Sequence, residues 1–177
     1  MLTRTRFAER LARHQQRLYG YAVAITGDRE RARDLLHDCV ERAAGARKSP
    51  ADDPAFRAWL FTIMRNLWID QVRADRRHSL ATETLGDARP DMPVSLETTM
   101  VNTFAVRQAF ERLSHDHREV LALVDISGFS YQEAADLLSV PRGTVMSRIS
   151  RAREALARLL ADDEPTVVPF SRAPRKA

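Results

Sequence analysis

Residues 130–160, SYQEAADLLSVPRGTVMSRISRAREALARLL, decide the fold of this chain. Ser130 and Glu133 have the S-x-x-E spacing of a capping box, which marks the start of a helix. The segment Ser139-Val140-Pro141 then interrupts the helical pattern, because proline cannot continue a helix but can stand at the start of the next one. The stretch therefore predicts two helices joined by a tight turn.

The second of these helices has two different faces. Apolar residues at helical spacing predict a narrow buried stripe, formed by Val145, Ile149, Ala152 and Leu156. A flanking stripe carries hydroxyl and guanidinium groups, on Thr144, Ser147, Arg148 and Arg151. Hydroxyls can bond phosphates or bases, and arginine can bind guanine through two hydrogen bonds. This combination is typical of a helix that enters the major groove of DNA.

Positive charge is concentrated on the same helix. Residues 141–160 hold 5 of the 28 Lys and Arg residues and 1 of the 24 Asp and Glu residues, so their surplus of +4 equals the formal net charge of the whole chain. The remainder is therefore balanced. An arginine run on its own is usually a solvated face, but its coincidence with a capping box and a turn favours DNA binding.

The N-terminal half also predicts helices. Two of them, over 7–25 and 28–43, show apolar residues at helical spacing. Gly27 is a typical C-terminal stop for the first, and Asp28 a typical N-cap for the second. A third helix, over 53–78, begins at an Asp-Pro pair, in which the aspartate is the expected cap and the proline lies in the first turn.

These patterns predict an all-α protein of two small helical domains. The first domain is expected over 1–78 and the second over 97–161. Residues 79–96 lose all periodicity and contain one glycine and two prolines, so they are expected to form a flexible linker that allows many domain arrangements. Residues 162–177 contain three prolines and are expected to be a disordered tail.

Composition argues against several other classes of protein. The single cysteine, Cys39, excludes an internal disulfide, and a zinc cluster would lack partner ligands. No glycine-rich phosphate loop and no apolar run of about 18 residues occurs. We therefore expect a cytoplasmic protein that is not an enzyme and has no cofactor, metal site, small-molecule substrate or membrane span.

The chain resembles bacterial sigma factors in both halves. Residues 113–156 resemble sigma region 4, and GTVMSRISRAR at 143–153 is the most specific part. GDRERARDL at 27–35 is similar to the polymerase-docking segment of region 2. The pattern WL…N…D…R of its promoter-melting helix matches Trp59, Leu60, Asn66, Asp70 and Arg73. The resemblance covers about residues 5–160 and is to the extracytoplasmic-function group, the minimal two-domain sigma factors.

The resemblance implies that core RNA polymerase is a partner. The helix over 28–43 would dock on it through exposed side chains, and the candidates are Asp34, Leu35, His37, Asp38 and Glu41. Leu35 also lies within the apolar stripe of this helix, so a place in the core stays open for it. At position 37 the family usually has glutamine, and a histidine stands there in this chain.

The resemblance also implies two contacts with promoter DNA. The -35 element would be bound by the second helix of the helix-turn-helix, through Arg142, Thr144, Ser147, Arg148 and Arg151. The -10 element would be bound by the loop at 47–56 and the helix that follows, which offer cations for a single strand and a pocket for an unstacked base. The residues expected there are Arg47, Lys48, Phe56, Arg57, Asn66, Asp70, Arg73, Arg76 and Arg77, with Arg65 on the same polar side. Trp59 and Trp68 are expected to lie in the core instead.

Two other classes of protein remain open on the sequence. A helix-turn-helix regulator with a ligand-sensing N-terminal domain would have a cavity within 1–78 and would bind a palindrome as a dimer. A sigma mimic that sequesters an anti-sigma factor would have a recognition helix without DNA-contacting residues, whereas Arg148 and Arg151 are present. For a sigma factor itself, an anti-sigma factor that covers both domains is an expected partner.

Overall fold

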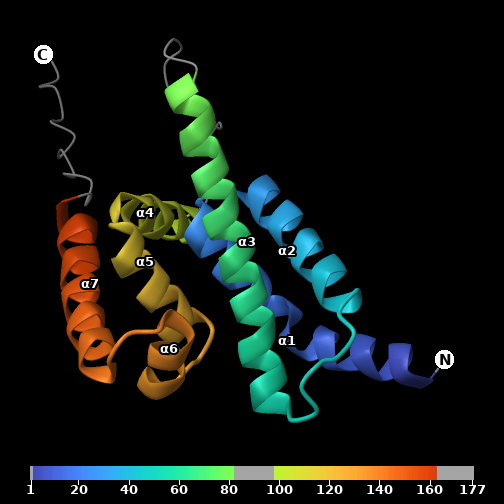
Figure 1. Cartoon of the computed structure of the whole chain (residues 1–177). Coiled ribbons are helices and arrows are strands. Elements are labelled where there is room, and N and C mark those ends of the chain that lie inside the picture. Colours follow the sequence, from blue (N-terminus) through green and yellow to red (C-terminus); the bar gives the residue numbers. More distant parts are fainter. Residues whose placement is uncertain (1, 82–97, 163–177) are drawn as a thin grey trace, which may run out of the picture.

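The computed structural model describes residues 2–81 and 98–162, and all regular secondary structure in these ranges is helical (Figure 1). The N-terminal half consists of α1 (Leu2–Thr26), α2 (Arg29–Ala44) and α3 (Asp53–Ala81). The C-terminal half consists of α4 (Thr98–Arg112), α5 (His115–Leu121), a π-helical turn η1 (Ala122–Ile126), α6 (Tyr131–Leu138) and α7 (Arg142–Asp162). The all-α prediction is confirmed.

The boundary between α1 and α2 follows the predicted signals. Gly27 has φ +71°, a left-handed conformation that glycine adopts without steric cost. The Asp28 carboxylate accepts hydrogen bonds from the backbone N–H groups of Glu30 and Arg31, both at 2.8 Å. Two orphan donors of the first turn of α2 are thereby satisfied.

The start of α3 corrects one prediction. The cap is Asp52, whose carboxylate accepts from the N–H of Ala55 at 3.0 Å. Asp53 already belongs to the helix, and its Oδ1 lies 3.1 Å from Nε of Arg10 on α1. This ion pair lowers the pKa of Asp53, because the carboxylate accepts a hydrogen bond from the guanidinium group. The aspartate therefore joins two helices rather than starting one.

Two helices extend slightly past the predicted limits of the domains. Helix α3 continues to Ala81, three residues beyond the expected end at 78, and α7 includes Asp162. The rest of the predicted linker and of the predicted tail lies outside the described residues.

The helix-turn-helix forms as predicted. The Ser130 hydroxyl accepts from the N–H of Glu133 at 3.2 Å, and Oε2 of Glu133 accepts from the N–H of Ser130 at 2.8 Å. At the end of α6, Ser139 adopts φ 56° and ψ 43°, the left-handed conformation that normally favours glycine. The chain can then reverse before Pro141 and α7.

Replacing Ser139 by glycine is expected to stabilise the protein by about 1 kcal/mol, because a Cβ atom in the left-handed region costs roughly 1–2 kcal/mol. Urea unfolding monitored by circular dichroism measures this change. Ser150→Gly is the matched control on the exposed side of α7 and should destabilise by about 1 kcal/mol, since glycine weakens a helix interior. Equal signs for the two variants would contradict the backbone argument.

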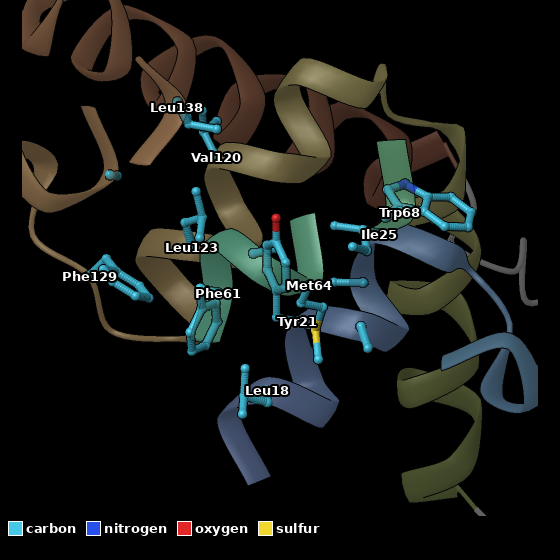
Figure 2. Packing of buried hydrophobic residues seen from close by; sticks show 14 of the residues in the cluster. Leu18, Tyr21, Ile25, Phe61, Met64, Trp68, Val120, Leu123, Phe129 and Leu138 are labelled. Atoms are coloured by element: carbon cyan, nitrogen blue, oxygen red, sulfur yellow. The ribbon is translucent and has the colours of Figure 1, made fainter. Parts of the chain in front are cut away.

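The two halves share one hydrophobic core. Tyr21 of α1 and Phe61 of α3 pack beside Leu123 of η1 and Phe129 of the loop before α6 (Figure 2). In Figure 1, α3 runs with α2 along one side and α5 and α6 on the other. Among the arrangements that a linker allows, the structure therefore shows one in which the halves are docked together. Within the described ranges, no helix has the combination of length and apolarity required to cross a membrane.

Candidate nucleic-acid interface

Helix α7 has the buried stripe that the sequence predicts. Val145 and Ala152 are fully buried and Ile149 nearly so, while Leu156 is half-buried. These residues hold α7 against α5 and α6. The opposite side of the helix faces solvent, with Ser150 and Arg151 exposed.

The predicted -35 residues are only partly exposed. Arg142 and Arg151 are exposed, whereas Thr144, Ser147 and Arg148 are half-buried. The Ser147 hydroxyl donates to the backbone carbonyl of Thr144 at 3.0 Å. The five residues thus lie on one side of α7 or at its N-terminus, and Arg151 is the most accessible member of the flanking stripe.

Two ion pairs flank this surface of α7. Nη2 of Arg148 lies 2.8 Å from Oδ2 of Asp116 on α5, and Nη2 of Arg153 lies 2.6 Å from Oδ1 of Asp125 in η1. The hydrogen bond to Asp125 raises the pKa of Arg153. Charge-assisted hydrogen bonds of this kind fix the direction of a guanidinium group. Met146, in the first turns of the same helix, is 48% exposed.

The two aspartates were missed by the sequence interpretation. Asp116 and Asp125 belong to no motif that we recognised, and each lies in a different element from the arginine that it binds. Only the packing of α5 and η1 against α7 brings them into contact. Each aspartate holds its arginine in place beside the predicted DNA-binding side of α7.

The C-terminal part of α3 carries most of the predicted -10 residues on its surface. They are exposed side chains at helical spacing: Asn66, Asp70, Arg73, Arg76 and Arg77. The last four of them line an open hollow of about 480 Å³. Arg47 and Lys48, in the loop between α2 and α3, are exposed as well. Cations along a groove suit a nucleic-acid strand.

Two predicted contact residues are buried instead. Phe56 is 0% exposed, with its ring centroid 5.7 Å from that of Phe7 and the guanidinium of Arg10 4.0 Å above it. Leu35 is also 0% exposed. Each lies on the apolar stripe of its helix, and this stripe faces the core. Neither side chain presents surface to DNA or to polymerase, so both predictions are corrected to core roles. Trp68 is buried and Trp59 half-buried, as expected.

Two arginines of α3 contact the other half of the chain. Nη2 of Arg57 lies 2.5 Å from Oε1 of Glu133, and Nε of Arg65 lies 2.8 Å from Oε1 of Glu119. The sequence interpretation placed both arginines toward DNA and assigned Glu133 only to the capping box. No local pattern could indicate these pairs, because each joins residues more than fifty positions apart.

Helix α2 presents most of the predicted polymerase-binding residues. Asp34, His37 and Glu41 are exposed, and Nε2 of His37 lies 3.2 Å from Oε1 of Glu41. Asp38 is half-buried and accepts a hydrogen bond from Gln71 of α3 at 3.4 Å. On the inner side, burial raises the pKa of Cys39 to about 12, so this thiol is chemically inert packing.

Within the described ranges, no group of three or more His, Cys, Asp or Glu side chains is arranged so that it could hold a metal ion. The surface features above are therefore two cationic regions and one polar helix face. That set suits a protein that binds nucleic acid and another protein.

Both halves of the chain match known protein families. Residues 11–78 match the family described as sigma-70 region 2, and residues 103–156 match sigma-70 region 4. The fold is therefore that of a transcription initiation factor of the sigma-70 class. More narrowly, the chain belongs to the ECF RNA polymerase sigma factors, as its relatives show.

Two curated relatives illustrate this membership. The chain is 35% identical over 151 residues to the ECF RNA polymerase sigma factor EcfG of Rhodopseudomonas palustris, covering 82% of this chain and 80% of that protein. It is 36% identical over 155 residues to the ECF sigma factor SigM of Mycobacterium tuberculosis, covering 87% and 76% of the two chains.

Two solved structures are similar in fold. One is the sigma factor RpoE of Bartonella quintana in complex with the anti-sigma factor NepR, with a TM-score of 0.68, 30% identity and coverage of 89% of this chain and 98% of that one. The other is CnrH in complex with the cytosolic domain of CnrY, with a TM-score of 0.67, 28% identity and 89% coverage of both chains.

Proposed function

We propose that this chain, as an ECF sigma factor, binds core RNA polymerase and directs it to promoters by reading a -35 element with α7 and a -10 element with α3. It acts in the cytoplasm, where the polymerase and the DNA are. It supplies no bond-making chemistry of its own, because RNA synthesis belongs to the polymerase.

The observation that carries this proposal is the joint presence of two nucleic-acid surfaces in one chain. Helix α7 presents Arg142 and Arg151 beside half-buried Thr144, Ser147 and Arg148. Helix α3 presents Asn66 and a row of charged side chains that line the open hollow. One surface suits a duplex and the other a strand, and promoter recognition with opening requires both.

Polymerase docking is assigned to the exposed side of α2. Asp34, His37 and Glu41 lie there, with Asp38 at its edge, and they give the helix a polar surface next to the -10 region on α3. A protein–protein contact at this position would hold α3 against the polymerase while it engages DNA.

Control by an anti-sigma factor belongs to the same proposal. Of the two solved structures cited above, one is the sigma factor RpoE in complex with the anti-sigma factor NepR, and the other is CnrH in complex with the cytosolic domain of CnrY. The docked halves of this chain have a fold similar to RpoE and CnrH. A regulator that covers both halves would therefore find its two contact regions already side by side.

Run-off transcription with purified core polymerase tests the function. Genomic fragments from the source organism serve as templates, and the transcripts are sequenced with and without the protein. Promoter-specific transcripts that appear only with the protein support the proposal. Tight, palindromic DNA binding by a dimer without any transcripts would favour a helix-turn-helix regulator instead.

A further inference from the structure

Two carboxylates of the C-terminal half form ion pairs with arginines for which the sequence predicts contact with DNA. The Arg57 side chain is only 15% exposed, because it forms an ion pair with Glu133 and packs on Phe129. The central carbon of its guanidinium group lies 4.3 Å from the centroid of the Phe129 ring. The Arg65 side chain contacts Glu119, whose own side chain is 5% exposed. Carboxylate and phosphate bind guanidinium groups in the same way, through charge-assisted hydrogen bonds. A guanidinium that holds one is less available to the other.

Apolar contacts lie between the two ion pairs. The rings of Phe61 and Phe129 meet edge to face, with centroids 4.8 Å apart, and both side chains are almost fully buried. Tyr21 of α1 packs against Phe61, with their ring centroids 5.2 Å apart. Figure 2 shows these aromatic residues together with Leu123. The interface between the halves in the docked state therefore combines packed aromatic side chains with two side-chain ion pairs.

The docked state is too compact to span a promoter. The names of the -35 and -10 elements place them about 25 base pairs apart, which is roughly 85 Å along B-DNA at 3.4 Å per base pair. A compact body of 177 residues has a radius of gyration of about 16 Å and hence a diameter of roughly 40 Å. The two halves must therefore separate before α3 and α7 can engage both elements.

We propose that the pairs Arg57–Glu133 and Arg65–Glu119, here called the latch, hold the free chain in a closed state by placing carboxylates where promoter phosphates bind in the open state. The proposal rests on the proposed function for the identity of the DNA. It makes the C-terminal half an intramolecular competitor for the surface of α3. Release of the latch exposes both arginines and lets the exposed surfaces of α3 and α7 move apart.

The Glu133 carboxylate of the latch is ionised at neutral pH. Burial by itself would raise the pKa of Glu133, but hydrogen bonds from the backbone and side chain of Ser130, together with Arg57, outweigh burial and lower it. A carboxylate with a lowered pKa contributes its stabilisation above that pKa and loses it as pH falls through it. The contact between Glu133 and Arg57 is therefore complete in the neutral range.

Glu133→Gln combined with Glu119→Gln removes the latch with little other change. Glutamine can replace glutamate in a capping box, so the start of α6 is preserved. Asp136→Asn removes one carboxylate from the same half and is the matched control for Glu133→Gln alone, because this exposed residue of α6 bonds Gln132 of the same helix. Circular dichroism verifies that each variant is folded.

The distance between the halves is measured by electron spin resonance in the full chain. Spin labels are attached through Arg33→Cys on α2 and Ala157→Cys on α7, both exposed positions, while buried Cys39 stays unlabelled. The labelled protein without further changes, and with Asp136→Asn, should give one narrow distance distribution. Loss of the charged hydrogen bonds should raise the open population roughly tenfold or more. An unchanged distance distribution in the double glutamine variant would overturn the proposal.

A reversible cross-link supplies a second, independent test. A Cβ atom built on Gly20 of α1 would lie 3.0 Å from Cγ2 of Ile126 in η1, which suits a disulfide between Gly20→Cys and Ile126→Cys. Oxidation should then reduce promoter-specific transcription with core polymerase at least tenfold, and dithiothreitol should restore it. The single-cysteine variants are the controls.

The outcomes separate the two proposals. If the oxidised protein transcribes as well as the reduced one, the closed state is competent and the latch is refuted. If wild type and the reduced variant both give no transcripts, the proposed function fails, and the spin-label distances still decide whether Glu119 and Glu133 hold the halves together.

Discussion

Replacing Arg151 by alanine is expected to lower the affinity of the polymerase holoenzyme for its -35 element by about 5- to 150-fold, the range of a lost bidentate base contact. Arg151 is exposed on α7, beside Ser147 and between the two ion pairs that flank this surface. The measurement is fluorescence anisotropy with labelled promoter DNA at several salt concentrations. A base contact changes sequence preference at one position, whereas a phosphate contact mainly reduces the salt slope by about one.

Arg158→Ala is the matched control for this prediction. Arg158 is exposed on the same helix, but its Nη2 lies 2.6 Å from Oε1 of Glu154 one turn away. Its removal deletes the same charge at some distance from the predicted base-reading residues, and we expect less than about a twofold effect, as for most surface substitutions. Equal losses for the two variants would mean that α7 attracts DNA only by charge.

Replacing Phe56 by alanine is expected to destabilise the protein by about 3–5 kcal/mol, the usual cost of deleting a buried aromatic side chain. The ring is fully buried among Phe7, Trp59 and the guanidinium of Arg10. Urea unfolding measures the change in the free energy of unfolding. Phe56→Leu should cost less and should leave promoter opening unchanged, because the side chain does not face DNA.

Lys48→Ala provides the comparison for stability. Lys48 is exposed in the loop that precedes α3, so its loss should change the free energy of unfolding by less than about 0.5 kcal/mol. The core assignment of Phe56 would be wrong if Phe56→Ala left stability unchanged and abolished promoter opening.

Local signals in the sequence were sufficient to predict most of the helices. Capping depends on residues within one turn, and therefore Asp28 and the Ser130–Glu133 box could be recognised from spacing alone. The Asp52-Asp53-Pro54 segment was harder, because two adjacent aspartates can each cap a helix. The distant residue Arg10 favours the observed register by binding Asp53.

The candidate site was predictable only where exposure follows from helical periodicity. Asn66, Asp70 and Arg73 lie on the polar side of α3 and are exposed as expected. Leu35 and Phe56 show the opposite case, since family resemblance favoured contact and the apolar stripe favoured burial. When the two criteria disagreed, periodicity gave the correct result.

Contacts between the halves could not be predicted. Glu119 and Glu133 are ordinary acidic residues in sequence, and their arginine partners lie beyond a segment without helical periodicity. Their roles depend on how α5 and α6 dock against α3, a relation that no local pattern encodes. The same holds for Asp116 and Asp125 beside α7.

The two oxygens of Glu133 have separate tasks. Oε2 accepts the backbone N–H of Ser130, and Oε1 receives the guanidinium of Arg57. Departure of the arginine consequently leaves the first turn of α6 intact, and α6 and α7 keep their shape throughout. The helix-turn-helix is then already ordered when it binds the promoter, so binding does not carry the free-energy cost of ordering its backbone.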